Sequence, residues 1–492
     1  MLTTDEINRL IQEDENSPRK QSAKIGARYY EGKHDILDYK LFYFDANGKL
    51  VEDKTRSNIK ICHPFFTELV DQCVQYMLSG KESFVKSDIP ELQEQLDLYF
   101  GDDFRDEFAD TLTDTCKGGF GDMYAYKNAD DRISFQYADA LGVVKVRAKD
   151  TDDHCEYVIY TYIDRIDKGQ KKIKRIQVWD KQQIYYFVQV DSNKIISDAD
   201  EPINPRPHIV YEKDNEEGKF GDSFDFIPFF RLDANRKQTS HLNPVKALID
   251  DYDLMACGLS NNLQDVSEAL YVVKGFQGDN MEELIQNIKT KKHIGVEPDG
   301  DVDIKTVDLP YDARVKKLEI DEKNIYKFGM GFNAAQLGDG NITNIVIKSR
   351  YVLLDLKCNK LETKVRAFLK KLVKIALQEI NDINETNYQL KDVYFEFERE
   401  VMTNASDNSQ IEKTEAETQQ IRLNTILNAA ARLDNDTVLQ AICDLFEFDF
   451  ESVKALVEQN PVVDLNAASE SLANAKVDEP EKPPDASEGG DA

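Results

Sequence analysis

The length, composition and charge of the chain limit the classes of protein to which it can belong. With 492 residues, of which 41% are hydrophobic and 10% aromatic, it can bury several cores and should divide into roughly two to four domains. Its 62 basic and 92 acidic residues give a net charge of −30. This charge argues against an ordinary nucleic-acid-binding protein, which needs a basic surface for the phosphates, so any contact with DNA must be of another kind.

Neither a membrane span nor a secretion signal is expected from the sequence. The longest apolar runs, such as residues 227–230, are far too short to cross a bilayer. The first residues lack both the basic and the apolar region of a signal peptide. We therefore expect a protein that is initially located in the cytoplasm where it is synthesised.

The first 230 residues combine helices with strands. Helical periodicity predicts helices within residues 1–35, from Pro64 to about Gly80, and over residues 89–116, the last ending at the pair Gly118-Gly119. The apolar segment that begins at Asn58 is typical of a short strand. These predictions place helices before and between the strands of one α+β domain.

A meandering antiparallel sheet is expected after residue 121. Alternating, β-branched and aromatic runs predict strands over residues 133–137, 157–163, 172–179, 184–190 and 208–211. The sequence Asp-Lys-Gly-Gln at residues 167–170 supplies the turn residues of a hairpin between two of these strands.

A long helical hairpin with a small head is predicted between residues 243 and 330. Asn243 followed by Pro244 is a strong helix start. This helix has an apolar stripe, and its opposite face, expected to be exposed, carries Asp250, Asp251, Asp253 and Asp265. A compact strand-and-turn insertion is expected over residues 270–309, after which Pro310 begins a second helix.

A loop rich in glycine and asparagine, residues 329–344, precedes a continuous helical pattern over residues 343–380. At 1.5 Å per residue this helix would be roughly 57 Å long. Between residues 343 and 375 nine Lys/Arg stand against two acids, a net charge of +7. These cations either pair with acidic neighbours or are simply solvated, and pairing is favoured in an oligomer of acidic subunits.

The remaining C-terminal part is predicted to be mostly helical. A strand is expected over residues 393–397 and helices over residues 409–433 and 436–459. The proline-rich, acidic tail beyond residue 466 has the composition of a disordered segment.

No motif in the sequence predicts catalysis, a cofactor or a metal. The Walker A pattern is absent, and Gly329-x-Gly331-x-x-Ala334 follows a helix rather than a strand, so it is a weak dinucleotide signal. The six histidines lack ligand spacing, and His63, before Pro64, is more typical of a structural partner. The seven cysteines are scattered without zinc-site spacing and are expected to be buried free thiols.

Several stretches, taken in order, resemble the portal proteins of long-tailed siphophages. Residues 28–36 and 58–72 look like the N-terminal signature of that family. Residues 247–253 with 260–262 resemble its first stem helix and residues 324–328 the end of its second. The segments 341–350 and 353–357 are similar to the loop and long helix beside the channel, although this chain has Thr343-Asn344 where many members have Ser-Gly. The resemblance covers roughly residues 20–400.

The resemblance implies an α+β, mostly helical portal fold. Its expected parts, in chain order, are the wing (1–240), stem helix one (241–269), the small α/β clip insertion (270–309), stem helix two (310–330), the channel loop (331–344), the long helix and return strand of the wing (345–400), the helical crown (401–465) and the acidic tail (466–492).

By the same resemblance two groups of residues would contact partners. The DNA channel loop would contribute Asn333, Gln336, Asp339, Asn341, Asn344 and Lys348. The clip would dock the terminase or the connector through Lys274, Lys289, Lys291, Lys292 and His293. The lysines of residues 289–292 are equally typical of an ordinary exposed loop.

The family resemblance implies a non-enzymatic homo-oligomeric ring of about twelve subunits. The ring would sit at the capsid portal vertex of the virion after assembly in the host cytoplasm, nucleate the procapsid and pass double-stranded DNA without sequence preference. Its partners would be the terminase large subunit, a head-completion or adaptor protein, the scaffold and the major capsid protein. The alternative is a cytoplasmic nucleotide-binding enzyme that uses the loop of residues 329–340.

Overall fold

The computed structural model describes most of the chain. The described residues are 2–45, 47–54, 56–80, 82–128, 130–147, 155–167, 171–190, 194–212, 219–265, 270–276, 284, 294–305, 311–333, 344–399, 405–446 and 448–459. The chain forms two compact units, one of residues 1–340 and 348–401 and the other of residues 341–347 and 402–492. Among the helices in these ranges, none combines the length and the apolar character needed to cross a membrane.

The N-terminal helices of the first unit are capped by their own sequence. Helix α1 (Thr4–Glu15) begins with a capping box in which Thr3 and Glu6 bond to each other's backbone amides. Ser17 caps α2 (Pro18–Tyr30), which has proline at its first position. A short 3-10 helix, η1 (Asp35–Asp38), follows. The prediction of an N-terminal helical region is confirmed.

Helices α3 (Phe65–Met77), α4 (Pro90–Tyr99), α5 (Asp102–Gly118) and α9 (Asn344–Asn384) bury most of the apolar residues of the main core. The single helix expected over residues 89–116 is wrong, because the chain breaks at Gly101 between α4 and α5. The predicted glycine end is confirmed: Gly119 adopts a left-handed conformation, with φ of 92°, at the end of α5.

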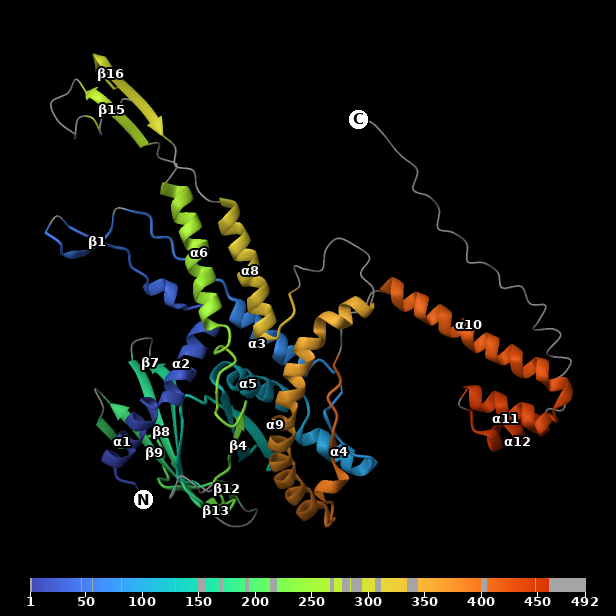
Figure 1. Ribbon diagram of the computed structural model, residues 1–492. Coiled ribbons are helices and arrows are strands. Elements are labelled where there is room, and N and C mark those ends of the chain that lie inside the picture. The colour runs from blue at the N-terminus through green and yellow to red at the C-terminus, as the bar shows by residue number, and fades with distance from the viewer. Residues whose placement is uncertain are drawn as a thin grey trace, which may run out of the picture. The chain divides into compact units, whose positions relative to one another are not determined.

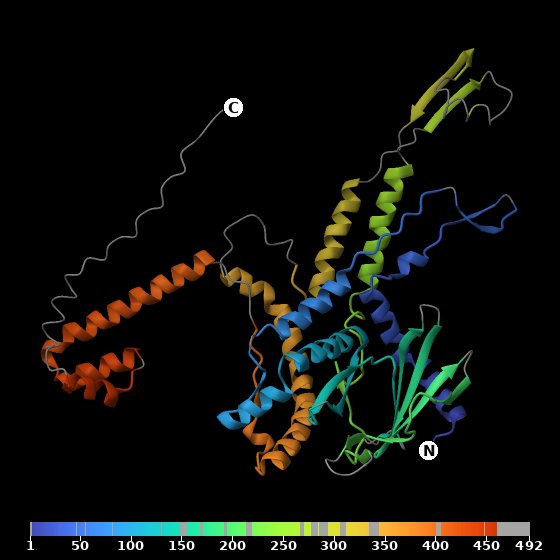
Figure 2. The same cartoon turned by 180° about the vertical axis from the view of Figure 1, so that it is seen from behind.

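The predicted antiparallel meander is confirmed for the strands expected over residues 157–163, 172–179 and 184–190 (Figures 1 and 2), whereas the strands expected over residues 133–137 and 208–211 lie in two smaller sheets. The largest sheet has the order β10-β9-β8-β7-β6, with β11 beside β9. Asp167 pairs with Lys171 at the predicted turn between β7 and β8. The strands are β6 (Val143–Arg147), β7 (Cys155–Asp167), β8 (Lys171–Trp179), β9 (Gln183–Val190), β10 (Lys194–Ser197) and β11 (Arg206–Pro207).

Smaller sheets complete the first unit. One has the order β14-β4-β5, formed by β14 (Phe229–Asp233), β4 (Phe120–Lys127) and β5 (Ile133–Ala138). The two-stranded sheets pair β1 (Phe42–Phe44) with β2 (Leu50–Glu52), β12 (Ile209–Glu212) with β13 (Lys219–Asp222), and β3 (Val85–Lys86) with β17 (Tyr394–Phe395), which follows the 3-10 helix η4 (Leu390–Asp392). The strand expected over residues 393–397 is thus shorter than predicted.

Helices α6 (Lys246–Asp265) and α8 (Tyr311–Gly329) lie side by side, and strands β15 (Leu270–Phe276) and β16 (Val296–Lys305) form an antiparallel pair between them in sequence (Figure 1). We call these four elements the arm. Helix α6 begins two residues after the predicted start at Pro244. The preceding turn is tighter than an α-helix, because the amide of Val245 bonds to Leu242, three residues back, at 2.9 Å.

The second unit contains α10 (Ala405–Ala429), the 3-10 helix η5 (Ala430–Arg432), α11 (Asn435–Phe446) and α12 (Phe450–Gln459). The single helix expected over residues 436–459 is wrong. Asp449 accepts hydrogen bonds from the amide and hydroxyl of Ser452 at 2.9 and 2.6 Å, which starts a new helix. The predicted disordered tail lies outside the described residues.

Candidate functional site

The two helices of the arm are joined by polar contacts along their length. Lys317 on α8 forms ion pairs with Asp251 on α6 and with Asp321 on its own helix. With its oxygen turned toward α8, the side-chain amide of Asn262 accepts hydrogen bonds from both terminal nitrogens of Arg314, at 2.8 and 2.7 Å. Such contacts hold two long helices in register without a wide apolar seam between them.

Aromatic rings fix the base of the arm to α3. Phe65, the first residue of α3, makes edge-to-face contacts with Tyr252 of α6 and Tyr326 of α8, at centroid distances of 4.8 and 5.9 Å. The Tyr326 hydroxyl donates to Glu68 at 2.5 Å. The arm is therefore seated on α3, one of the helices that form the main core.

The segment before α3 is extended but is not a strand, so this prediction is wrong. Its alternate backbone amides, at Ile59, Ile61 and His63, bond to side chains of α6 instead of to another strand. The acceptors are Asn261 Oδ1 at 2.6 Å, Cys257 Sγ at 3.2 Å and Asp253 Oδ1 at 3.0 Å. The three amides are two residues apart, which is about 6.6 Å in an extended chain. Their acceptors are four residues apart on α6, which is about 6 Å along a helix, so the donors and the acceptors have matching spacings.

Asp253 is the centre of this contact and is fully buried. The expectation that it lies on an exposed face of α6 is wrong, because the N-terminal segments cover it. His34 and His63 each place Nδ1 on one carboxylate oxygen, at 2.6 and 2.7 Å. Burial opposes the charge of Asp253, but the hydrogen bonds from the two imidazoles outweigh it and hold its pKa below the usual value.

The predicted role of His63 as a structural partner is confirmed, and His34 is a second partner that the sequence did not indicate. The ring of His34 stacks on Tyr29 at 4.6 Å. The Tyr29 hydroxyl reaches Asp250, which lies about one turn before Asp253 on α6. The N-terminal segments at residues 28–36 and 58–72 thus both lie against the first helix of the arm.

The residues predicted for the channel loop are only partly described. Asn333 is buried and its amide donates to Glu322 of α8 at 2.8 Å. Asn344 is the first residue of α9, and Lys348 is exposed on that helix. Gln336, Asp339 and Asn341 lie outside the described residues. The assignment of these six residues to a DNA channel stays a prediction.

The glycines before this loop are packed against protein. A Cβ added at Gly329 or Gly331 would lie 2.6 or 2.2 Å from a methyl carbon of Leu69. The side-chain amide of Gln72 bonds to both the amide and the carbonyl of Phe332, at 2.9 and 2.7 Å. The backbone groups of Phe332 already have hydrogen-bond partners, and the space beside the two glycines is filled by Leu69. This segment therefore does not form a phosphate-binding loop.

One of the predicted clip residues lies in the described part of the arm. Lys274 is exposed on β15, opposite Asp301 of β16. Lys289, Lys291, Lys292 and His293 fall outside the described residues, and their docking role stays a prediction.

The basic residues of α9 separate into two classes. Lys357 is buried and donates to the carbonyls of Leu69 and Gly329 at 3.3 and 3.1 Å. Arg366 pairs with Glu362 on the same helix. Four exposed lysines, however, lie on one side of α9, within about 80° around the helix axis at 3.6 residues per turn. None of the ion pairs among the described residues includes them. We call Lys360, Lys364, Lys371 and Lys374 the lysine stripe.

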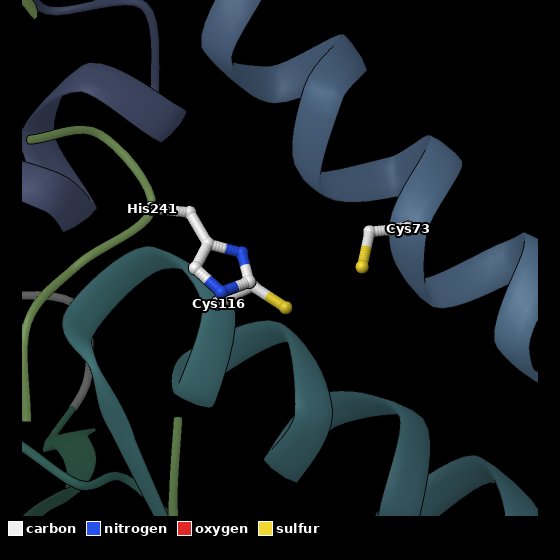
Figure 3. A group of neighbouring side chains, drawn as sticks. All are labelled: Cys73, Cys116 and His241. Carbon is white, nitrogen blue, oxygen red and sulfur yellow. The ribbon is translucent and has the colours of Figure 1, made fainter. Parts of the chain in front are cut away.

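One cluster of possible metal ligands was not indicated by sequence spacing. Cys73 of α3, Cys116 of α5 and His241, in the turn before α6, bring their ligand atoms within 4.8 Å of one another (Figure 3). Cys358 of α9 places its sulfur 3.7 Å from that of Cys73. The expectation of buried free thiols is confirmed for these cysteines and for Cys257 and Cys443, whereas Cys62 and Cys155 are partly exposed.

Comparison with known proteins identifies the family of the chain. The family model described as "Phage portal protein, SPP1 Gp6-like" matches residues 11–449. The portal protein of Bacillus phage SPP1 is 26% identical over 365 residues, which are 74% of this chain and 70% of that protein. The portal protein of Clostridium phage phiCD119 is 26% identical over 437 residues, 83% of this chain and 89% of that protein. The chain therefore belongs to the SPP1 Gp6-like family of phage portal proteins.

Proposed function

We propose that this protein forms a closed ring at one capsid vertex, through which double-stranded DNA enters during packaging and leaves during ejection. The family match over residues 11–449 is the observation that carries the proposal. The arm supports it, because a narrow two-helix projection with a small sheet is suited to line a channel and reach a partner at its end.

The arm has a composition that favours contact with further copies. Several large apolar side chains on its two helices are more than a third exposed in the single chain, namely Leu254, Leu263, Tyr311, Ile320 and Phe328. Exposed apolar residues gathered on one projecting element are typical of a protein interface. Neighbouring copies of the arm in a ring would cover them.

The lysine stripe supplies a second contact between copies. Each subunit carries a net charge of −30, so a neighbouring copy has acids in excess that can pair with this exposed row of four lysines. Ring closure needs two different surfaces of each subunit that match. We propose that the lysine stripe is one of these two surfaces and that its lysines form ion pairs with acidic residues of the neighbouring subunit.

The net charge also suits a conduit. Acidic walls repel phosphate and keep a duplex away from the protein, so that DNA can move in both directions without being held. Short polar loops, including the predicted channel residues, would touch the backbone without reading bases. In this proposal the sheet of the arm is the docking site for the terminase and later for the head-completion protein, and the force comes from a separate ATPase.

A nucleotide-binding enzyme is not favoured. That alternative depends on the loop that begins at Gly329, whose first residues are packed on Leu69 and bonded to Gln72. A phosphate needs free backbone amides in an open loop. Here the amide of Gly331 bonds to Tyr326 at 2.9 Å.

Native mass spectrometry with negative-stain microscopy on the purified full chain tests the proposal. We expect closed rings of about a dozen subunits with a central hole. A chain that stays monomeric or dimeric at high concentration in every salt condition would contradict it. The double variant Lys364→Glu and Lys371→Glu should reduce the fraction of chain in rings, whereas Lys24→Glu, an exposed lysine of α2, should not.

A further inference from the structure

Three possible metal ligands meet where the arm joins the helical core, and a fourth lies beside one of them. Three of the four are cysteines on three different helices, namely Cys73 (α3), Cys116 (α5) and Cys358 (α9). The remaining one is His241, whose backbone amide bonds to the carbonyl of Cys116 at 3.0 Å. All three cysteines are fully buried. Side chains of these types that lie close together although they come from distant parts of the sequence are candidates for metal ligands.

The spacing of three of these atoms is close to that of a tetrahedral zinc site, whereas the Cys358 sulfur lies outside the group of ligand atoms that are all within 4.8 Å of one another. Ligands at about 2.3 Å from zinc at tetrahedral angles place two sulfurs about 3.8 Å apart. The sulfurs of Cys73 and Cys358 are 3.7 Å apart. The ligand atoms of Cys73, Cys116 and His241 lie within 4.8 Å of one another, so shifts of about 1 Å would bring them to zinc-binding distances. In Figure 3 both sulfurs and the imidazole face the same gap.

His241 provides an independent sign of a missing ligand. Its Nδ1 atom is buried and has no hydrogen-bond partner among the described residues. A buried nitrogen without a partner costs about 1–3 kcal/mol, and His241 Nδ1 is one of six such side-chain atoms in the described part of the chain. A metal ion in the adjacent gap would satisfy an imidazole nitrogen that the protein itself does not.

The surroundings fit the charge and the access that such a site needs. A divalent cation with three thiolates and one neutral imidazole has a net charge of −1. Lys357, the residue next to Cys358, is buried and positively charged and can balance it. Lys357 and His241 also line the same surface cavity, of about 210 Å³, so the histidine side of the cluster is next to solvent.

We propose that Cys73, Cys116 and His241 bind one structural zinc ion and that Cys358, whose sulfur lies beside that of Cys73, turns its side chain to complete the ligand set. Binding forms three zinc–sulfur bonds and one zinc–nitrogen bond and releases the three thiol protons to solvent, so affinity falls as the pH falls. The ion would tie α3, α5 and α9 to the turn that leads into α6. It would thereby stiffen the root of the arm, and this inference does not depend on ring formation.

The test uses the full chain purified under reducing conditions, with zinc and cobalt as the probes. We expect about one zinc per chain by elemental analysis. Cobalt added to metal-free protein should give the visible bands of a tetrahedral site and a thiolate-to-cobalt charge-transfer band. These measurements on the parent chain need no variant to fold.

Variants then assign the ligands. Cys116→Ser, Cys358→Ser and His241→Ala should each weaken cobalt binding by at least about a hundredfold, whereas Cys443→Ser, a buried cysteine of α11, should leave it unchanged. The proposal is overturned if the parent chain binds less than about a tenth of an equivalent of zinc. It is equally overturned if Cys443→Ser has the same effect as Cys116→Ser.

Discussion

Replacing Asp253 with asparagine should release the N-terminal segments from α6. The carboxylate accepts three hydrogen bonds, from Nδ1 of His34 and from both Nδ1 and the amide of His63, at 2.6, 2.7 and 3.0 Å. The asparagine side chain would be uncharged, and one of its two polar atoms would be a donor facing another donor. At least one charge-assisted hydrogen bond is therefore lost, at a cost of about 2–3 kcal/mol.

This loss can be measured locally by hydrogen exchange. A change of 2–3 kcal/mol corresponds to an increase of roughly 30-fold to 140-fold in the open population of the segment. Mass spectrometry of peptides covering residues 56–64 should show faster exchange of the amides of Ile59, Ile61 and His63, which bond to α6. The core of α5 should be unaffected.

A matched control separates the buried carboxylate from a general change of charge. Glu319→Gln removes one negative charge from α8, but Glu319 is 57% exposed and pairs only with the exposed Lys316 in the described part of the chain. Exposed pairs of this kind contribute at most about 1 kcal/mol. If Asp253→Asn exchanges within about twofold of the parent chain, the carboxylate does not hold the segment and the reasoning is refuted.

Three further results are expected. The pKa of Asp253 is lowered in the folded chain. Its contribution to stability is therefore present above the pKa of the unfolded chain, about 3.9, and is lost as the pH falls through the pKa of the folded chain. Release of residues 56–64 already near pH 6 in the exchange experiment would contradict this. Gly331→Ala should destabilise the end of α8 by about 1–3 kcal/mol, because its Cβ would overlap Leu69, and the same substitution should cost less when a denaturant titration compares it in a chain that already carries Leu69→Ala. Lys20→Met should cost about 3 kcal/mol, since the buried ammonium donates to three carbonyls, of Ala140, Leu141 and Val143; an unchanged melting temperature would show that these groups are satisfied in another way.

Local sequence determined the elements whose signal is periodic. Helix α9 extends over residues 344–384 where residues 343–380 were predicted, because its apolar stripe repeats at helical spacing through the whole segment. The meander of β7, β8 and β9 followed from alternation and from the turn residues at 167–170. The family resemblance also followed from short stretches in order, which the match over residues 11–449 confirms.

The tertiary structure alone decided which polar residues are buried and what they contact. The extended segment at residues 59–63 has the pattern of a strand, but its hydrogen-bond partners are side chains of α6, about 190 residues later in the chain. Asp253 has the sequence context of an exposed acid, and only His34 and His63 make it an interior group. The ligand cluster at Cys73 likewise depends on residues up to 285 positions apart. Spacing along the chain carries no signal for such contacts, because packing between distant elements brings them together.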